Sequence, residues 1–247
     1  MARALRLAAR GLDTTDPNPR VGCVIAAGDE VVGEGFHERA GGPHAEVVAL
    51  AAAGTRAKGA TAYVTLEPCS HYGRTPPCAD ALVAAGVARV VYAVGDPNPR
   101  VNGGGAARLR DAGIEVGTGP LGGQARALNP GFHSRMERGR PWLRLKLACS
   151  LDGRTALANG ESRWITSEAA RRDVQRLRAR SSAILTGVGT VLADDPRLDV
   201  RLPGATRQPL RVVLDPRLET PASARVLRPP GDVLVLASEA GAPGAAR

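Results

Sequence analysis

Aromatic side chains are scarce in this chain: phenylalanine, tyrosine and tryptophan make up only 3% of its 247 residues. Proteins that bind single-stranded nucleic acid usually stack bases on aromatic rings, so this scarcity argues against that class. Lysine is also rare, with Lys58 and Lys146 as its only examples, and arginine carries nearly all the positive charge. The formal charge of +9 still indicates an anionic partner, and a small phosphate ester fits better than nucleic acid.

Long apolar runs are missing too. The longest, Val47 to Ala53, is far short of the ~20 residues that span a bilayer. Arg3, Arg6 and Arg10 interrupt the N-terminal segment before a signal-like apolar core can form. We therefore expect no membrane partner.

Cysteine is limited to four residues. They could form two disulfides, but Cys69 and Cys78 belong to a motif described below, and Cys23 and Cys149 lie in apolar, strand-like runs. A reducing compartment is the better interpretation, and we expect a cytoplasmic protein.

Strand-like and helix-like segments alternate along the chain, which predicts an α/β fold with a mainly parallel sheet and an antiparallel hairpin at its start. Pro141 is the expected boundary between two domains, 1–140 and 141–247. The expected strands of the first domain are 20–27, 30–36, 61–66, 88–94 and 114–116, and its helices include 2–10, 44–53, 78–85 and 105–112. The second domain is expected to contain a helix over 167–181 and strands at 143–149, 183–187, 210–215 and 232–238.

The triplet His44-Ala45-Glu46, followed by Pro68-Cys69 and then Cys78, is the most informative pattern. One imidazole and two thiolates suit a zinc ion and leave a fourth position for water, which zinc acidifies. Glu46 would stay off the metal and move protons between that water and a departing amine. This is the ligand order of zinc deaminases, H-x-E with P-C-x-x-C.

The cysteine spacing differs from that signature, because eight residues separate Cys69 from Cys78. The insert, 70–77, is polar and rich in turn-forming residues, and we interpret it as a loop that contacts substrate. A purely structural zinc knot or two buried free thiols are the alternatives. A spare carboxylate beside the ligand histidine has no purpose in a closed structural site.

Several strings resemble the bifunctional riboflavin-biosynthesis family, in which a pyrimidine deaminase is fused to a pyrimidine reductase. They include GGPHAEVVAL, AYVTLEPCSHYGRTPPCADAL and ILTGVGTVLADDPRL. The resemblance implies a cytidine-deaminase-like three-layer α/β/α domain followed by a partial dihydrofolate-reductase-like α/β domain. It also implies zinc and NADPH as cofactors, a phosphorylated pyrimidine as the small-molecule substrate, and no nucleic acid partner; we also expect a homo-oligomer.

In the deaminase half, the resemblance places zinc on His44, Cys69 and Cys78, with Glu46 as the catalytic residue. It implies substrate contacts at Asn18, His37, His71, Arg74 and Asn98. Asn18 and Asn98 lie in two copies of the string DPNPRV, which taken alone could be ordinary turns. Arginine at position 74 suits a phosphate, although several relatives carry lysine there.

In the reductase half, the resemblance implies two sets of contacts, and without it Trp164 and Arg178 would be read as core packing and a solvated helix face. The substrate set is Lys146, Ser162, Arg178, Leu198 and Arg201, and the NADPH set is Cys149, Trp164, Thr190 and Asp194. Because the segment after residue 140 is roughly half the length usual for this reductase, we expect the chain to deaminate but to reduce poorly.

Two other functions compete with this interpretation. A nucleic-acid deaminase acting on flipped adenine or cytosine is compatible with the basic charge, but not with the long loop and the missing aromatics. A non-catalytic, zinc-stabilised binding module is weaker still.

Overall fold

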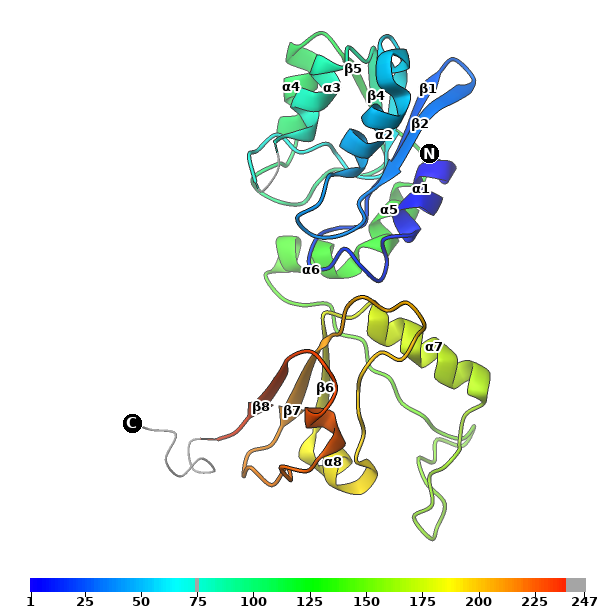
Figure 1. The fold of residues 1–247 in the computed structure, drawn as a ribbon, viewed down its shortest axis with the longest axis vertical. Coiled ribbons are helices and arrows are strands. Elements are labelled where there is room, and N and C mark those ends of the chain that lie inside the picture. The colour runs from blue at the N-terminus through cyan, green and yellow to red at the C-terminus, as the bar shows by residue number, and fades with distance from the viewer. Residues whose placement is uncertain (74–75, 239–247) are drawn as a thin grey trace. The chain divides into compact units, whose positions relative to one another are not determined.

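The computed structural model describes residues 1–73 and 76–238. It divides into two compact units, Met1–Leu143 and Arg144–Arg247, shown in Figure 1. No helix among the described residues is long and apolar enough to cross a membrane.

The first unit is built on a five-stranded sheet of order β2-β1-β3-β4-β5. Strands β1 and β2 form the expected antiparallel hairpin, β1 pairs with β3 in antiparallel fashion, and β3, β4 and β5 run parallel. The strands are β1 Gly22–Ala27, β2 Glu30–Phe36, β3 Thr61–Val64, β4 Arg89–Tyr92 and β5 Glu115–Thr118. The predicted α/β organisation with one initial hairpin is confirmed.

Helices surround this sheet (Figure 1). Their short apolar side chains fill the core between the layers. They are α1 Ala2–Ala9, α2 Ala45–Ala53, α3 Cys78–Ala84, α4 Gly104–Asp111, α5 Gly122–Leu128 and α6 Pro130–Arg138, with a 3-10 turn η1 at Gly54–Ala57. The core combines Ile25, Val64, Leu82, Val90 and Leu109, all fully buried.

Close packing of α2 on β2 depends on two glycines. A Cβ atom at Gly33 would lie 2.2 Å from the carbonyl oxygen of Ala49, and one at Gly35 would lie 2.4 Å from that of Ala45. A side chain at either position would therefore push α2 outward. Because His44 directly precedes α2, this packing also determines the position of that imidazole.

The second unit contains a three-stranded parallel sheet of order β6-β7-β8. Its elements are α7 Glu168–Ala179, β6 Ala183–Gly187, α8 Val188–Asp194, β7 Leu210–Leu214, the 3-10 turn η2 Arg225–Leu227, and β8 Val233–Leu236. Its small core gathers Val191, Leu198, Val213 and Val226. Ser167 caps α7 by accepting a hydrogen bond from the backbone N–H of Ala170.

The prediction of a buried strand over 143–149 is wrong. This segment has no strand structure, and Leu143, Leu145 and Leu147 are 83%, 83% and 66% exposed. Alternating leucines favour a strand, but a strand also needs a neighbour for its backbone hydrogen bonds, and no described segment pairs with this one. Cys149 is accordingly exposed, whereas Cys23 is buried in β1 as expected.

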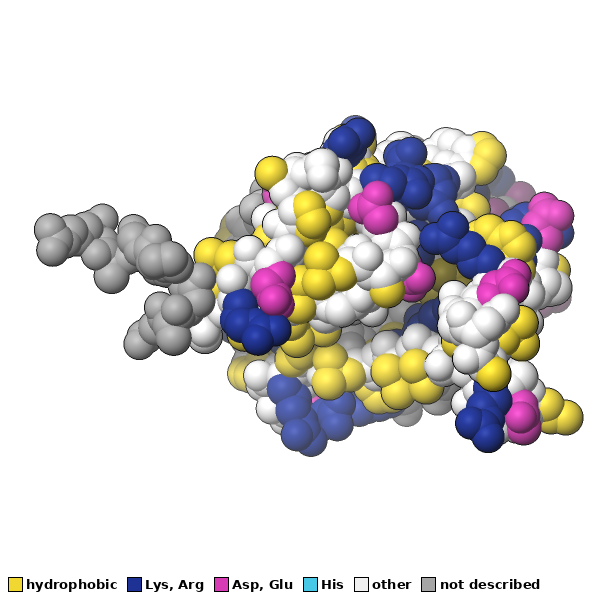
Figure 2. Space-filling view, turned by 90° about the horizontal axis from the view of Figure 1, so that it is seen from below, with side chains coloured by type: hydrophobic (Ala, Val, Ile, Leu, Met, Phe, Trp, Pro, Cys, Tyr) yellow, Lys and Arg dark blue, Asp and Glu magenta, His cyan; other side chains and the backbone are white. Residues whose placement is uncertain are grey.

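Charged groups on the surface are largely interspersed. In the view of Figure 2, Lys and Arg side chains (dark blue) lie in separate groups, several of them next to acidic side chains (magenta). In the second unit, Arg172 pairs with Glu168, and Arg217 pairs with Glu219. On the face shown, the positive charge is therefore spread over several separate groups.

Candidate metal centre and active site

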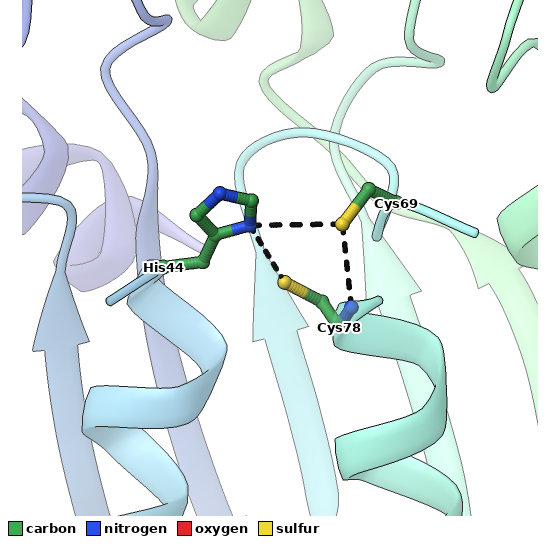
Figure 3. A group of neighbouring side chains, drawn as sticks. All are labelled: His44, Cys69 and Cys78. Atoms are coloured by element: carbon green, nitrogen blue, oxygen red, sulfur yellow. Dashed lines mark hydrogen bonds between the residues drawn. The ribbon is translucent and has the colours of Figure 1, made fainter. Parts of the chain in front are cut away.

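Three predicted ligands converge at the ends of three different elements (Figure 3). His44 directly precedes α2, Cys69 follows β3, and Cys78 is the first residue of α3. His44 Nδ1 lies 2.9 Å from Cys78 Sγ and 3.6 Å from Cys69 Sγ. All three ligand atoms lie within 4.8 Å of one another. The eight-residue insert therefore returns Cys78 to the same point as Cys69.

The surroundings favour the ligating form of Cys69. Its sulfur accepts a hydrogen bond from the backbone N–H of Cys78 at 3.2 Å. The Cys78 thiol, followed by the His44 ring and that N–H group, lowers the pKa of Cys69, although burial opposes the effect. The hydrogen bond with Cys69 raises the pKa of His44. A thiolate at Cys69 is thus stabilised from three sides.

This donor set fits zinc. One imidazole nitrogen and two thiol sulfurs are the ligands that zinc prefers, and three protein ligands leave a tetrahedral position open for water or substrate. No fourth His, Cys, Asp or Glu joins this group among the described residues. The nitrogen of His44 that faces the sulfurs is Nδ1.

Glu46 lies in the first turn of α2, two residues beyond His44, and is only 3% exposed. Burial raises the pKa of its carboxyl to about 7, and the Cys69 thiolate adds to the rise, while His44 and hydrogen bonds oppose it. One of those hydrogen bonds joins Glu46 to Cys78. A carboxyl with such a pKa can both accept and donate a proton near neutral pH.

Asn18 and His37 form a pair beside the ligand histidine. Asn18 Nδ2 lies 3.0 Å from His37 Nε2, and His37 Nδ1 lies 2.9 Å from the carbonyl oxygen of Pro43. The His37 and His44 rings meet edge to face, with centroids 5.4 Å apart. Two of the predicted substrate contacts are thus adjacent to the metal ligands.

The other predicted contacts of this half differ in their surroundings. His71 is half-buried, and its Nδ1 has no hydrogen-bond partner among the described residues. Asn98 Oδ1 accepts a hydrogen bond from the backbone N–H of Arg100 at 3.1 Å, so part of its capacity is used locally. Arg74 lies outside the described residues.

Some of the predicted reductase residues come together around Asp199, a buried carboxylate. Arg201 and Arg197 form ion pairs with the Asp199 carboxylate. Arg178 donates a hydrogen bond to the backbone carbonyl oxygen of Asp199 at 3.1 Å. Burial, followed by repulsion from Arg201, lowers the pKa of Arg178. Leu198, also buried, precedes Asp199 with a positive φ of 55°.

A second group lies near α8, whose sequence contains Thr190 and Asp194. Arg163 Nη2 donates to the carbonyl oxygen of Asp194 at 3.3 Å and so brings the segment with Ser162 and Trp164 close to this helix. Trp164 is 71% exposed, and the Arg171 guanidinium lies 4.3 Å from its ring centroid. The ring is therefore not core packing.

Lys146 and Cys149 are not joined to these groups. Both are exposed, and no hydrogen bond or ion pair links them to the other predicted reductase residues within the described part of the chain.

Asn129 supports the site, although no pattern in the sequence points to it. Its side chain accepts a hydrogen bond from the backbone N–H of Arg20 at 2.7 Å and donates to the carbonyl oxygen of Arg20 at 2.9 Å. This clamp holds the loop that carries Asn18. The two residues are 109 positions apart, a separation that no local pattern spans.

Comparison with known proteins agrees with this geometry. The model of the cytidine and deoxycytidylate deaminase zinc-binding region matches residues 1–94, and the model of the RibD C-terminal domain matches 141–243. The structure of Acinetobacter baumannii RibD, form 1, superimposes with a TM-score of 0.92 at 56% identity, over 96% of this chain and 68% of that one. The chain belongs to the RibD family.

Other RibD proteins give the same result. RibD of Escherichia coli K12 is 59% identical over 244 residues, which are 94% of this chain and 66% of that protein. RibD of Haemophilus influenzae is 58% identical over 227 residues, or 87% of this chain and 61% of that protein. The chain thus spans less than two thirds of the length of these RibD relatives.

A second solved structure is also similar to this chain. It is a diaminohydroxyphosphoribosylaminopyrimidine deaminase/5-amino-6-(5-phosphoribosylamino)uracil reductase from Thermotoga maritima. It matches with a TM-score of 0.90 at 41% identity, over 96% of this chain and 68% of that one. The first unit therefore has the cytidine-deaminase-like fold, and the second has the fold of the RibD reductase domain, as the resemblance implied.

Proposed function

We propose that this chain acts in riboflavin biosynthesis as a zinc-dependent deaminase of a phosphoribosylated diaminopyrimidine, 2,5-diamino-6-ribosylamino-4(3H)-pyrimidinone 5′-phosphate. The observation that carries the proposal is the convergence of His44, Cys69 and Cys78 beside the buried Glu46. Membership in the RibD family supports the choice of substrate. The deaminase domain is proposed to be 1–140, followed by a reductase domain at 141–247.

In the proposed mechanism, His44, Cys69 and Cys78 would hold the zinc ion. When bound, zinc supplies Lewis-acid chemistry that acidifies a water molecule to a pKa of about 7. Glu46 would accept a proton from the attacking water molecule and then donate it to the departing nitrogen, while the second proton of the water would pass to the ring nitrogen next to the reacting carbon. Water and the aminopyrimidine would thus become ammonia and a ring carbonyl beside an N–H group. Burial of Glu46 keeps its carboxyl away from competing solvent.

Five residues are proposed to bind the substrate of this reaction. Asn18, His37, His71 and Asn98 would bind the pyrimidine and its sugar, His37 chiefly by orienting Asn18, and Arg74 would bind the phosphate. The Nδ1 of His71 has no hydrogen-bond partner among the described residues, which supports its assignment, because a buried ring nitrogen without a partner is costly until a ligand supplies one. A guanidinium at position 74 can make paired hydrogen bonds to phosphate oxygens.

The second unit is proposed to bind NADPH and to reduce the ribosyl group of the deaminated product to ribityl. Arg178, Leu198 and Arg201, gathered around Asp199, would take the substrate together with Lys146 and Ser162. Cys149, Trp164, Thr190 and Asp194 would contact NADPH. NADPH oxidation by the purified chain with the deaminated substrate tests this activity.

We further propose that the chain forms a homo-oligomer, is cytoplasmic and has no nucleic acid partner. Size-exclusion chromatography with light scattering measures the first, and the substrate comparison below addresses the last.

The decisive experiment measures zinc content and ammonia release with the purified chain. The substrates are the phosphorylated diaminopyrimidine and, separately, oligonucleotides that contain cytosine or adenine. Chain stripped of metal by a chelator, then restored with zinc, is the control. We expect zinc-dependent ammonia release from the diaminopyrimidine. Ammonia release from the oligonucleotides instead would establish a nucleic-acid deaminase. Zinc binding without ammonia release from either kind of substrate would support a non-catalytic, zinc-stabilised binding module.

A further inference from the structure

Glu67 has a buried carboxylate that holds a single later segment of the chain. It lies two residues before Cys69 and is 4% exposed. Its Oε2 accepts hydrogen bonds from the backbone N–H groups of Asp96 at 3.3 Å and Gly103 at 3.1 Å. Its Oε1 accepts one from the N–H of Ala106 at 3.1 Å. One side chain thus fixes both ends of the loop over 96–103 and the first turn of α4.

The same segment packs closely on the residues that flank Cys69. A Cβ atom at Gly105 would lie 1.7 Å from the carbonyl oxygen of Pro68, and one at Gly104 would lie 2.8 Å from Ser70 Oγ. At position 105 only glycine allows this approach without displacing backbone atoms, whereas a side chain at position 104 would displace the Ser70 hydroxyl. The start of α4 therefore lies directly against the neighbours of a metal ligand.

The loop that Glu67 holds contains the polar residues Asp96 and Asn98, which are joined by a hydrogen bond. Asp96 is 8% exposed, and its Oδ1 accepts a hydrogen bond from the backbone N–H of Asn98 at 2.8 Å. Burial, with added contributions from the charges of Glu67 and Cys69, raises the pKa of Asp96 to about 6. Asp96 is thus a buried member of this loop, and its side chain holds the backbone of Asn98.

We propose that Glu67 is a positioning residue of the deaminase site, which ties Asp96 and Asn98 to the strand end that carries Cys69. A carboxylate is required because all three partners are N–H donors, and a charged acceptor makes stronger hydrogen bonds with them than a neutral one. The positive end of the α4 dipole adds to this preference. An amide at position 67 would turn N–H groups toward at least one of these donors. The inference rests on the proposed deaminase function, since it assigns a role in the same site.

The test compares wild-type chain with Glu67→Gln, Glu67→Asp and the control Glu115→Gln, whose side chain is exposed and pairs with Arg89 on the surface. Zinc content, KM and kcat with the phosphorylated diaminopyrimidine, and amide hydrogen exchange are measured for each. For Glu67→Gln we expect full zinc content, kcat within about twofold of wild type, and KM raised about tenfold, the order expected from weakened charge-assisted hydrogen bonds. Exchange should accelerate at Asp96, Gly103 and Ala106. Glu67→Asp should have a KM between those of wild type and Glu67→Gln, and Glu115→Gln should match wild type.

Several outcomes overturn the proposal. Loss of zinc in Glu67→Gln would show that Glu67 stabilises the metal site and does not position substrate-binding groups. An unchanged KM would show that Glu67 has no positioning role. Hydrogen exchange of the wild-type chain tests the geometry even if the variants do not fold: unprotected amides at Gly103 and Ala106 would contradict the three hydrogen bonds. Failure of the deaminase assay with wild-type chain would refute the proposed function alone, because zinc content and amide exchange still report on Glu67.

Discussion

His37 accepts a hydrogen bond from Asn18 while donating one to Pro43. The Nδ1 of the ring lies 2.9 Å from the Pro43 carbonyl oxygen, and a carbonyl only accepts, so Nδ1 carries a proton. Burial lowers the pKa of His37, which favours the neutral ring and leaves Nε2 as the acceptor for Asn18 Nδ2 at 3.0 Å. Asn18 therefore keeps its Oδ1 available for an N–H group of a ligand.

This arrangement predicts that His37 acts mainly through Asn18. Either His37→Ala or Asn18→Ala should raise KM for the diaminopyrimidine about two- to tenfold, the effect of one neutral hydrogen bond. The double variant should raise KM no more than Asn18→Ala does alone. Steady-state kinetics of the four proteins form a double-mutant cycle. Independent, multiplying effects on KM would instead show that His37 contacts the substrate directly.

Cys69→Ser should abolish stoichiometric zinc binding. The hydroxyl of serine is a much poorer ligand than a thiolate, and two remaining ligands do not make a tetrahedral site. Metal analysis of the purified protein measures the loss. Cys149→Ser is the matched control, because Cys149 is exposed and outside the ligand group, and it should keep one zinc per chain. Full zinc content in Cys69→Ser would remove Cys69 from the ligand set.

Glu46→Gln should retain zinc and lose about 10²–10⁴-fold in kcat, the usual contribution of a general acid/base. The amide fills the same space but cannot carry the proton. The control is Glu30→Gln, an exposed residue paired with Arg56, which should behave like wild type. Deaminase rates and zinc content are measured together, and near-normal turnover of Glu46→Gln would rule out the mechanism.

Asn129→Ala should destabilise the first unit by about 1–3 kcal/mol, because the buried backbone N–H and carbonyl of Arg20 lose their partner. It should also raise KM through the loop that carries Asn18. Urea unfolding and kinetics measure the two effects. Asn129→Asp keeps the acceptor for the N–H but places a carboxylate against the carbonyl, so it should not restore stability. Wild-type stability in Asn129→Ala would contradict the clamp.

Glu137 should stabilise the pairing of α5 with α6 in a pH-dependent way. Its hydrogen bonds with Arg126 are the largest cause of a pKa lowered to about 2. Because the folded pKa lies below the unfolded value of about 4.3, this stabilisation is complete above about pH 4.3 and is lost as pH falls toward 2. Glu137→Gln should be less stable than wild type at pH 7, and the difference should vanish near pH 2. Urea unfolding at several pH values tests this, and a difference independent of pH would contradict it. Added salt at pH 7 should also reduce the difference in unfolding free energy between wild type and Glu137→Gln.

Much of the fold could be predicted because its signals are local. Apolar runs with glycine or proline at their ends predicted α2, β1 and β4 within a few residues, and the short turn at Gly28-Asp29 predicted the hairpin. The prediction of a strand from the alternating leucines of 143–149 is wrong for a physical reason. Their alternation is a local property, whereas a strand is stabilised by a neighbour that the sequence does not identify.

The sequence by itself determined the chemistry of the site. It predicts a zinc ligand set with a free carboxylate from His44, Glu46, Cys69 and Cys78, because few other arrangements need those residue types together. The tertiary structure decided how these groups are held. The clamp of Asn129 on Arg20, the orientation of Asn18 by His37, and the three amides gathered by Glu67 all join segments far apart in the chain. Such contacts depend on which strand and helix ends meet at one edge of the sheet, and only the folded chain brings those ends together.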